Sequence, residues 1–268
     1  MPKPESITSA ANPLLKDVRR AIAGGGLTSQ GWCVAETFHL LEEALRAGCD
    51  TPAVLAAESV QAAVQAQVER LPNVRLAVLP DALLQRISGA ETSQGVIALV
   101  KPPVWNLERL FGGRPLLVVL DGLQDPGNAG AIARAAEAFG ATGMVFLKGT
   151  VSPWNPKTLR ASAGSLFRVP YVLGLDAAQT CAALHQHKVQ LYAGVPARAG
   201  TAGRSIAEVD LTAPCALTVG NEARGVSHAL RAAALDVSIP TAGVESLNAA
   251  MAAGILLYEA RRQRTARP

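Results

Sequence analysis

Cysteine, aromatic residues and long apolar runs are all scarce in this chain of 268 residues. The four cysteines, Cys33, Cys49, Cys181 and Cys215, lie far apart and include no C-x-x-C pair. This spacing argues against a zinc site and against a disulfide framework. Aromatic side chains make up only 4% of the residues, so we expect helices packed tightly on sheets rather than an aromatic-rich β-interior.

The sequence also lacks the features of exported and membrane proteins. Its first residues, Met1-Pro2-Lys3-Pro4-Glu5-Ser6, contain no apolar core of a signal peptide. The most apolar segment, 249–258, is shorter than the roughly 18 residues that a membrane span requires. We therefore expect a cytoplasmic protein without membrane segments. The net charge of +4 permits a polyanionic partner without demanding one.

Length and the order of patterns along the chain predict two α/β domains. The first covers residues 1–101, where strand and helix patterns alternate. Lys101-Pro102-Pro103 interrupts the alternation, and residues 102–113 are the predicted linker. The second domain, 114–268, begins with the apolar run 115–120, which is typical of a parallel strand buried on both faces.

The expected elements follow from periodicity and from Gly and Pro positions. In the first domain we expect strands over 32–35, 52–57, 74–78 and 95–100, and helices over 12–22, 38–47, 60–70 and from 81. In the second we expect strands over 115–120, 143–147, 169–173, 190–194, 216–219 and 237–239, and helices over 128–139, 156–163 and 246–264.

The loop after the first strand of the second domain, 121–130, lies where Rossmann folds bind a pyrophosphate. Its spacing is Gly127-x-x-Gly130 rather than G-x-G-x-x-G, and no acidic residue occurs between Glu137 and Asp176 to hold a ribose. A nucleotide-dependent oxidoreductase is therefore disfavoured. Asn128 is placed to cap the following helix, whose Ile132, Ala135 and Phe139 would face the sheet. By pattern alone, Arg134 is either solvated, paired with Glu137, or functional.

Two further segments lie near the C-terminus. In Gly220-Asn221-Glu222-Ala223-Arg224-Gly225, the acidic residue is either a helix-start charge or a partner for Arg134. Ser246-Leu247-Asn248 opens the last helix, and Ser246 is a candidate N-cap. The body of that helix, 249–257, is small and apolar nearly all round, so we expect it to be buried.

These three segments, in this order, resemble the signature motifs of the SpoU (TrmH-type) RNA ribose 2′-O-methyltransferases. One departure is that the usual Ser-Leu-Asn-Val-Ser is Ser-Leu-Asn-Ala-Ala here. The resemblance implies a C-terminal α/β-knot (SPOUT, deep trefoil knot) domain, which sequence patterns alone would not suggest. Segments 7–16 and 92–96 resemble the smaller L30e-like RNA substrate-binding domain attached to many of these enzymes.

The resemblance also implies roles for single residues. The catalytic residues would be Asn128, Arg134, Glu222, Ser246 and Asn248; S-adenosylmethionine would lie against Val219, Gly220, Ile239 and Leu247; and RNA would contact Lys16, Arg19, Arg20 and Arg160. The implied protein is a homodimer without a metal. A guanidinium is a poor proton acceptor, so we expect Arg134 to stabilise developing alkoxide charge rather than to act as the base.

The implied reaction transfers a methyl group to a ribose 2′-hydroxyl, and ribosomal RNA is favoured over transfer RNA. A transfer RNA 2′-O-methyltransferase is one alternative. Another is a non-catalytic RNA-binding assembly factor that keeps the fold, against which the intact Asn128, Arg134 and Glu222 argue.

Overall fold

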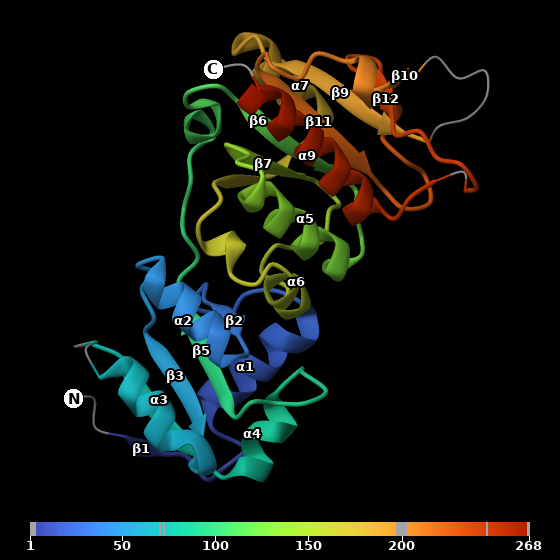
Figure 1. Cartoon of the computed structure of the whole chain (residues 1–268). Helices are drawn as coiled ribbons and strands as arrows, with labels where there is room; N and C mark the ends of the chain where they lie inside the picture. Colours follow the sequence, from blue (N-terminus) through green and yellow to red (C-terminus); the bar gives the residue numbers. More distant parts are fainter. Residues whose placement is uncertain (1–3, 70, 72, 197–202, 245, 267–268) are drawn as a thin grey trace. The chain divides into compact units, whose positions relative to one another are not determined.

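The computed structural model describes residues 4–69, 71, 73–196, 203–244 and 246–266. The chain forms two compact units, drawn with their elements in Figure 1. The N-terminal unit contains Met1–Val104 and Ser152–Arg168, and the C-terminal unit contains Trp105–Val151 and Val169–Pro268.

The N-terminal unit is built on a mixed five-stranded sheet in the order β1-β4-β3-β5-β2. Strands β1, β4 and β3 are parallel, whereas β5 pairs antiparallel with both β3 and β2. Its strands are β1 (Glu5–Ser6), β2 (Cys33–Ala35), β3 (Ala53–Ala57), β4 (Arg75–Leu79) and β5 (Val96–Val100). Its helices are α1 (Pro13–Gly24), α2 (Phe38–Arg46), α3 (Gln61–Val68), α4 (Asp81–Ile87) and α6 (Pro156–Ala161), with short 3-10 turns η1 (Glu58–Val60) and η3 (Ser165–Phe167).

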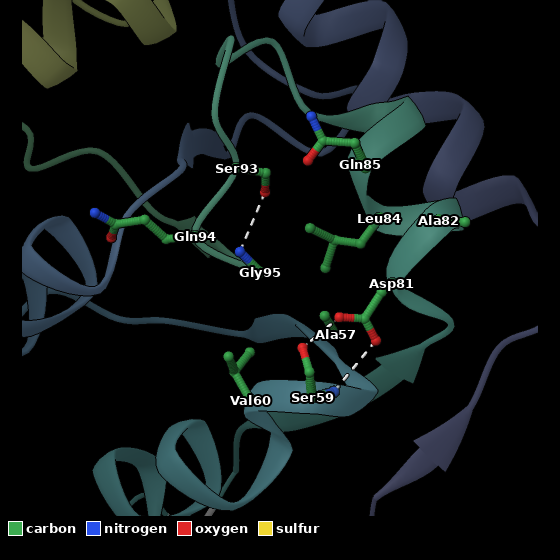
Figure 2. Close-up of a pocket in the computed structure, with 10 residues that line it drawn as sticks. All are labelled: Ala57, Ser59, Val60, Asp81, Ala82, Leu84, Gln85, Ser93, Gln94 and Gly95. Atoms are coloured by element: carbon green, nitrogen blue, oxygen red, sulfur yellow. Dashed lines mark hydrogen bonds between the residues drawn. The ribbon is translucent and has the colours of Figure 1, made fainter.

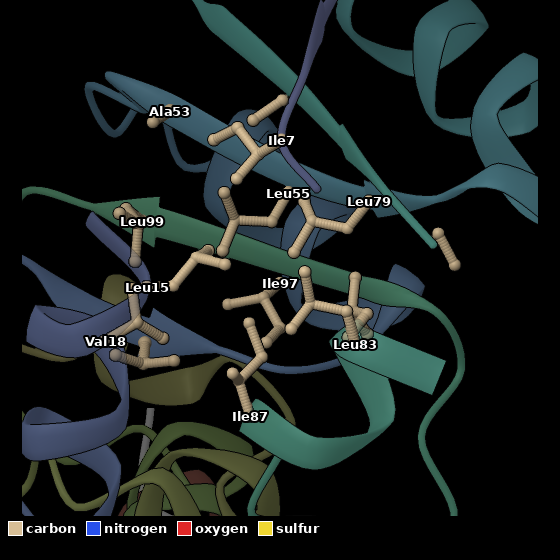
Figure 3. Close-up of a cluster of buried hydrophobic side chains, with 14 of the residues drawn as sticks. Ile7, Leu15, Val18, Ala53, Leu55, Leu79, Leu83, Ile87, Ile97 and Leu99 are labelled. Carbon is tan, nitrogen blue, oxygen red and sulfur yellow. The ribbon is translucent and has the colours of Figure 1, made fainter. Parts of the chain in front are cut away.

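Both faces of this sheet are covered, because every residue of β2, β3 and β5 is buried. Figure 3 shows the core on one face, where Leu15 and Val18 of α1 and Leu83 and Ile87 of α4 meet side chains of the strands. Helices α2 and α3 pack against β5 and β3. The α/β class predicted for this region is therefore confirmed.

Segment Ser152–Arg168 joins the N-terminal unit, although the sequence placed it inside the second domain. Asn155 caps α6 by accepting a hydrogen bond from the N–H of Lys157 at 2.9 Å. The guanidinium of Arg160 pairs with Glu36, whose side chain is only 1% exposed. Removing one member of a buried ion pair typically costs about 3–5 kcal/mol, so this contact holds the segment firmly.

The C-terminal unit contains an all-parallel seven-stranded sheet in the order β10-β12-β9-β11-β6-β7-β8. Its strands are β6 (Leu116–Asp121), β7 (Gly143–Leu147), β8 (Tyr171–Leu175), β9 (Gln190–Val195), β10 (Arg204–Ser205), β11 (Cys215–Gly220) and β12 (Leu235–Ser238). Its helices are α5 (Pro126–Ala138), α7 (Ala177–Gln186), α8 (His228–Arg231) and α9 (Ala249–Ala266), with 3-10 turns η2 (Leu107–Phe111) and η4 (Ile206–Glu208).

Helices α5 and α9 lie side by side on one face of this sheet (Figure 1), and α9 also contacts β11. Phe139, at the end of α5, meets Tyr258 of α9 edge-to-face with ring centroids 5.9 Å apart. The other face carries a core that includes Leu110 of η2, Leu184 of α7 and Leu230 of α8. The sheet is therefore buried on both sides, as the continuous apolar run of β6 predicts.

Several expectations differ from the structure. Helix α7 was missed, and the predicted linker 102–113 contains η2, whose Leu110 is fully buried in the C-terminal unit. Asp125 rather than Asn128 caps α5. Ile132 of that helix is buried as expected, but Ala135 and Phe139 are only partly buried, and Ala136 is buried instead. Helix α9 is not buried all round, since Met251 is 58% and Tyr258 54% exposed.

Candidate functional site

Three loops meet at the carboxyl-terminal edge of the parallel sheet in the C-terminal unit. Adjacent strands β6 and β11 end at Asp121 and Gly220, which are paired in register. The N–H of Ser227 donates to the Asp121 carboxylate at 2.7 Å, and Asn221 Nδ2 donates to the Gly122 carbonyl at 2.9 Å. Ligands of open parallel sheets bind outside this edge, so these loops define the candidate site.

A short chain of side chains links all three predicted motifs. Asn248 Nδ2 donates to Asn128 Oδ1 at 2.9 Å, and Asn128 Nδ2 donates to Glu222 Oε1 at 3.3 Å. A carboxylate only accepts hydrogen bonds, so Glu222 fixes the orientation of the Asn128 amide and leaves its oxygen for Asn248. Of the five predicted catalytic residues, the structure brings these three together.

Glu222 is an ionised carboxylate within this network. Partial burial acts to raise its pKa, but hydrogen bonds from its own N–H, from the Asn128 side chain and from the N–H groups of Gln124 and Asp125 outweigh burial and lower it. A carboxylate with a lowered pKa is a weak proton acceptor. Its role in the geometry is to orient the loop 124–128.

The loop after β11 folds back on its own strand. Asn221 and Gly225 exchange two backbone hydrogen bonds, of 3.0 and 2.8 Å, and Gly225 has φ +70°. A Cβ on Gly220 would lie 2.1 Å from the carbonyl carbon of Gly225, so only glycine fits there. Asn221 Oδ1 also accepts from the N–H groups of Ala223 and Arg224.

Asn248, not Ser246, is the residue that caps α9. Its Oδ1 accepts from the N–H groups of Ala250 and Met251, at 2.9 and 3.2 Å. Ser246 is exposed and lies three residues before the first residue of the helix, so the expectation that it caps α9 was wrong. Asn248 therefore has two tasks, since the same side chain caps the helix and contacts Asn128.

Arg134 lies on α5 and is exposed. Its guanidinium has no hydrogen bond or ion pair with any residue that the structure describes, so the expected Glu222–Arg134 contact is not formed within one chain. Arg134 is the one predicted catalytic side chain, apart from Ser246, that the network does not include.

The four predicted cofactor residues lie at the ends of β11 and β12 and just before α9. Val219 is buried, while Gly220, Ile239 and Leu247 are partly exposed. Within the described part of the chain, the N–H groups of Ser246 and Leu247 donate no hydrogen bond. These positions offer half-buried apolar side chains beside free main-chain donors, which suits an uncharged aromatic group.

The predicted RNA-binding residues differ in exposure and in whether they already form an ion pair. On α1, Lys16 and Arg19 are exposed, whereas Arg20 pairs with Asp17. Arg160 is committed to the buried carboxylate of Glu36, which sequence reasoning did not anticipate. An RNA contact by Arg160 has to compete with that ion pair.

Sequence reasoning also missed Asp121 and Asn221. Both hold main-chain groups of the neighbouring loop, and a polar residue at the end of a buried strand is the pattern that points to such a role. Among the described residues no cluster of three His, Cys, Asp or Glu could hold a metal ion. No helix in the described ranges has the length and apolar character needed to cross a membrane.

Comparison with known proteins gives two family matches. Residues 115–258 match the model of the SpoU rRNA methylase family, and residues 27–98 match the MRM3-like substrate binding domain. An uncharacterised tRNA/rRNA methyltransferase of Synechocystis is 34% identical over 97% of this chain and 95% of its own length. The 23S rRNA (guanosine(2553)-2′-O)-methyltransferase RlmP of Bacillus subtilis is 31% identical over 96% of this chain and 99% of its own.

Solved structures agree with these matches. An AdoMet-bound rRNA methyltransferase from Sinorhizobium meliloti superposes with a TM-score of 0.82 at 27% identity, covering 97% of this chain and 98% of that one. The SpoU methyltransferase AviRb from Streptomyces viridochromogenes, in complex with AdoMet, also gives 0.82, at 28% identity over 95% and 98%. The chain belongs to the SpoU rRNA methylase family.

Proposed function

We propose that this protein transfers a methyl group from S-adenosylmethionine to a ribose 2′-hydroxyl of ribosomal RNA. The single observation that carries the proposal is the Glu222–Asn128–Asn248 chain, which joins all three family motifs at the carboxyl edge of one parallel sheet. Several relatives are named as 23S rRNA 2′-O-methyltransferases, which favours ribosomal RNA as the substrate.

The residues at this edge fit S-adenosylmethionine. Ile239 and Leu247 offer apolar contact to an adenine ring, and the N–H groups of Ser246 and Leu247, which donate to no residue that the structure describes, offer donors for its nitrogen atoms. Bound there, the cofactor would supply an electrophilic methyl group on a sulfonium sulfur. No cation is needed to activate the leaving group, because it departs as a neutral thioether.

The protein's task is to orient the hydroxyl and to stabilise its charge as it loses a proton. The Asn128 amide retains one N–H and one lone pair beyond its bonds to Glu222 and Asn248, and these can position the hydroxyl. Ser246, exposed beside the network, can hydrogen-bond the same group. Arg134 is assigned to the developing alkoxide and the adjacent phosphate, since a guanidinium stays protonated.

Arg134 is proposed to act across a homodimer. Within one chain it has no partner among the described residues, and the exposed side of α9 carries Met251 and Tyr258 beside α5. Two large apolar side chains exposed on α9 favour a protein partner there. A second copy seated on this face would bring Arg134 of the partner subunit towards the motif loops.

The deep trefoil knot is likewise proposed from family membership. Supporting it, the last helix, α9, contacts α5 and β11, and Arg264 near its end donates to the carbonyls of Arg114, Pro115 and Ala213. The C-terminus is thus tied to the segment that begins the C-terminal unit.

The test is methyl transfer from radiolabelled S-adenosylmethionine to an unmodified 23S ribosomal RNA transcript. A 2′-O-methyl group blocks alkaline cleavage of the adjoining phosphodiester, so the product nucleotide should survive as an alkali-resistant dinucleotide. Arg134→Ala should lower kcat by about two to three orders of magnitude while calorimetry shows unchanged cofactor binding. The matched control is Arg109→Ala, an exposed arginine of the same unit, which should behave as the unaltered protein.

Arg134→Lys separates two roles for the guanidinium. If Arg134 stabilises charge, lysine should retain part of the activity with an unchanged pH profile. Near-normal turnover with a strongly shifted pH profile would instead assign Arg134 as the base. Absence of cofactor binding by the unaltered protein would favour an assembly role without catalysis.

A further inference from the structure

A cavity of about 410 Å³ opens in the N-terminal unit. No residue of the three signature motifs lines it, but Ser93, Gln94 and Gly95 of segment 92–96 do. Figure 2 shows that its lining comes from the end of β3 and η1, from α4, and from the loop that precedes β5. Its volume lies within the roughly 300–1,000 Å³ of ordinary ligand sites. Apolar contact is supplied by Ala57, Val60 and Leu84.

Polar side chains stand at the opening of the cavity. Asp81, Gln85 and Gln94 line it and are exposed. The loop that carries Gln94 is held in place, since Gln94 Oε1 accepts from the N–H of Phe38 at 3.0 Å. The Nε2 group of Gln94 and the amide of Gln85 have no hydrogen bond within the described residues, so both are available to a ligand.

The charge of the lining selects against phosphate. Asp81 is the one charged side chain among the lining residues. A hydrogen bond from the hydroxyl of Ser59, with a weaker one from its N–H, lowers the pKa of Asp81, so the carboxylate is ionised at neutral pH. A cavity with one carboxylate, two amides and apolar walls suits an uncharged, flat ligand that presents N–H donors.

We propose that this cavity binds an unpaired guanine base of the RNA, with its N1–H and 2-amino groups donating to Asp81; the proposal rests on the proposed function. Guanine is the RNA base with two adjacent donors on its Watson–Crick edge, and a carboxylate has lone pairs for both beyond those used by Ser59. Gln85 and Gln94 can donate to O6. Unpaired bases are the groups that proteins recognise most specifically in RNA.

The test fills the cavity in the full-length protein. Ala82→Phe places a ring in it from an exposed position of α4, and Ala66→Phe makes the same change at an exposed position of α3 outside the cavity. With the 23S transcript, Ala82→Phe should raise KM for RNA roughly tenfold and leave kcat within twofold. Ala66→Phe should leave both values within twofold.

Kethoxal, which modifies N1 and N2 of unpaired guanine, reads the contact directly. The unaltered protein and Ala66→Phe should protect at least one guanine of the transcript that Ala82→Phe leaves reactive, and Asp81→Asn should weaken that protection. Equal KM values for the two phenylalanine variants, or no guanine protected through the cavity, would overturn the inference. If either result is obtained while the unaltered protein still transfers methyl groups, only the guanine site is refuted and the proposed function stands. If the unaltered protein transfers no methyl group, the proposed function itself is refuted.

Discussion

Gly220→Ala tests whether the fold of the loop after β11 is what creates the cofactor site. The added Cβ would lie 2.1 Å from the carbonyl carbon of Gly225, 2.2 Å from the nitrogen of Val226 and 2.3 Å from the Gly225 oxygen. Carbon atoms in contact are normally about 3.5–4.0 Å apart, and main-chain atoms cannot rotate away. The loop must therefore open by more than about 1 Å.

Opening the loop breaks both hydrogen bonds between Asn221 and Gly225. At about 1 kcal/mol for each bond plus 1–3 kcal/mol of overpacking strain, we expect a loss of about 3–5 kcal/mol in unfolding free energy. Urea unfolding followed by circular dichroism measures it. Calorimetry should show S-adenosylmethionine affinity reduced at least tenfold, because the cofactor is proposed to lie against the main chain at Gly220.

Gly225→Ala is the control within the same loop. Gly225 has φ +70°, but its Cβ would meet no atom within 4 Å, so only backbone strain of about 1–2 kcal/mol is expected. Two results would contradict the reasoning: equal losses of unfolding free energy in Gly220→Ala and Gly225→Ala, or normal cofactor binding by Gly220→Ala. In either case the close approach of the Gly225 main chain would not be what requires glycine at position 220.

Two further predictions concern stability. Hydrogen bonds lower the pKa of Glu222 in the folded state despite its partial burial, so the ionised carboxylate stabilises the fold above the unfolded pKa near 4.5, and this stabilisation is lost as pH falls through the folded pKa. Glu222→Gln should therefore reduce the pH dependence of the urea-unfolding free energy between about pH 5 and 3. An unchanged pH dependence would contradict the role given to Glu222. Arg264→Lys should cost about 2–4 kcal/mol in thermal unfolding, because one ammonium cannot replace a guanidinium that donates to the carbonyls of Leu211, Arg114, Pro115 and Ala213. Arg262→Lys alters only the pair of the exposed Arg262 with Glu259 and should cost under about 1 kcal/mol; equal losses in the two variants would refute the reasoning.

Sequence patterns predicted best the strands that are buried on both faces. Strand β7 was predicted with its observed bounds, Gly143–Leu147, and β6 within one residue, because central parallel strands are continuously apolar. Helix α7 was missed since its apolar residues, such as Leu184, are few and widely spaced among alanines. Capping was misplaced where two candidates lie within three residues, as with Asp125 and Asn128.

Placement of Ser152–Arg168 was beyond reach of the sequence. Its pattern of a short helix and basic residues is local, whereas its partners Glu36 and Glu43 lie more than a hundred residues away in the sequence. The family resemblance assigned Arg160 to RNA. Only the fold shows a buried carboxylate opposite its guanidinium.

The motifs were recognisable from sequence, but their mutual dependence was not. Glu222 accepts from Asn128, the Asn128 oxygen accepts from Asn248, and the Asn248 oxygen accepts from the first N–H groups of α9. The carboxylate at one end of this chain only accepts hydrogen bonds and the α9 N–H groups at the other end only donate, so both ends orient the two amides. Protonating Glu222 would weaken the constraint at its own end, while the helix start would still direct Asn248 Nδ2 towards the Asn128 oxygen. The three motifs act as one unit because a change in any of them leaves a polar group of the next without its partner.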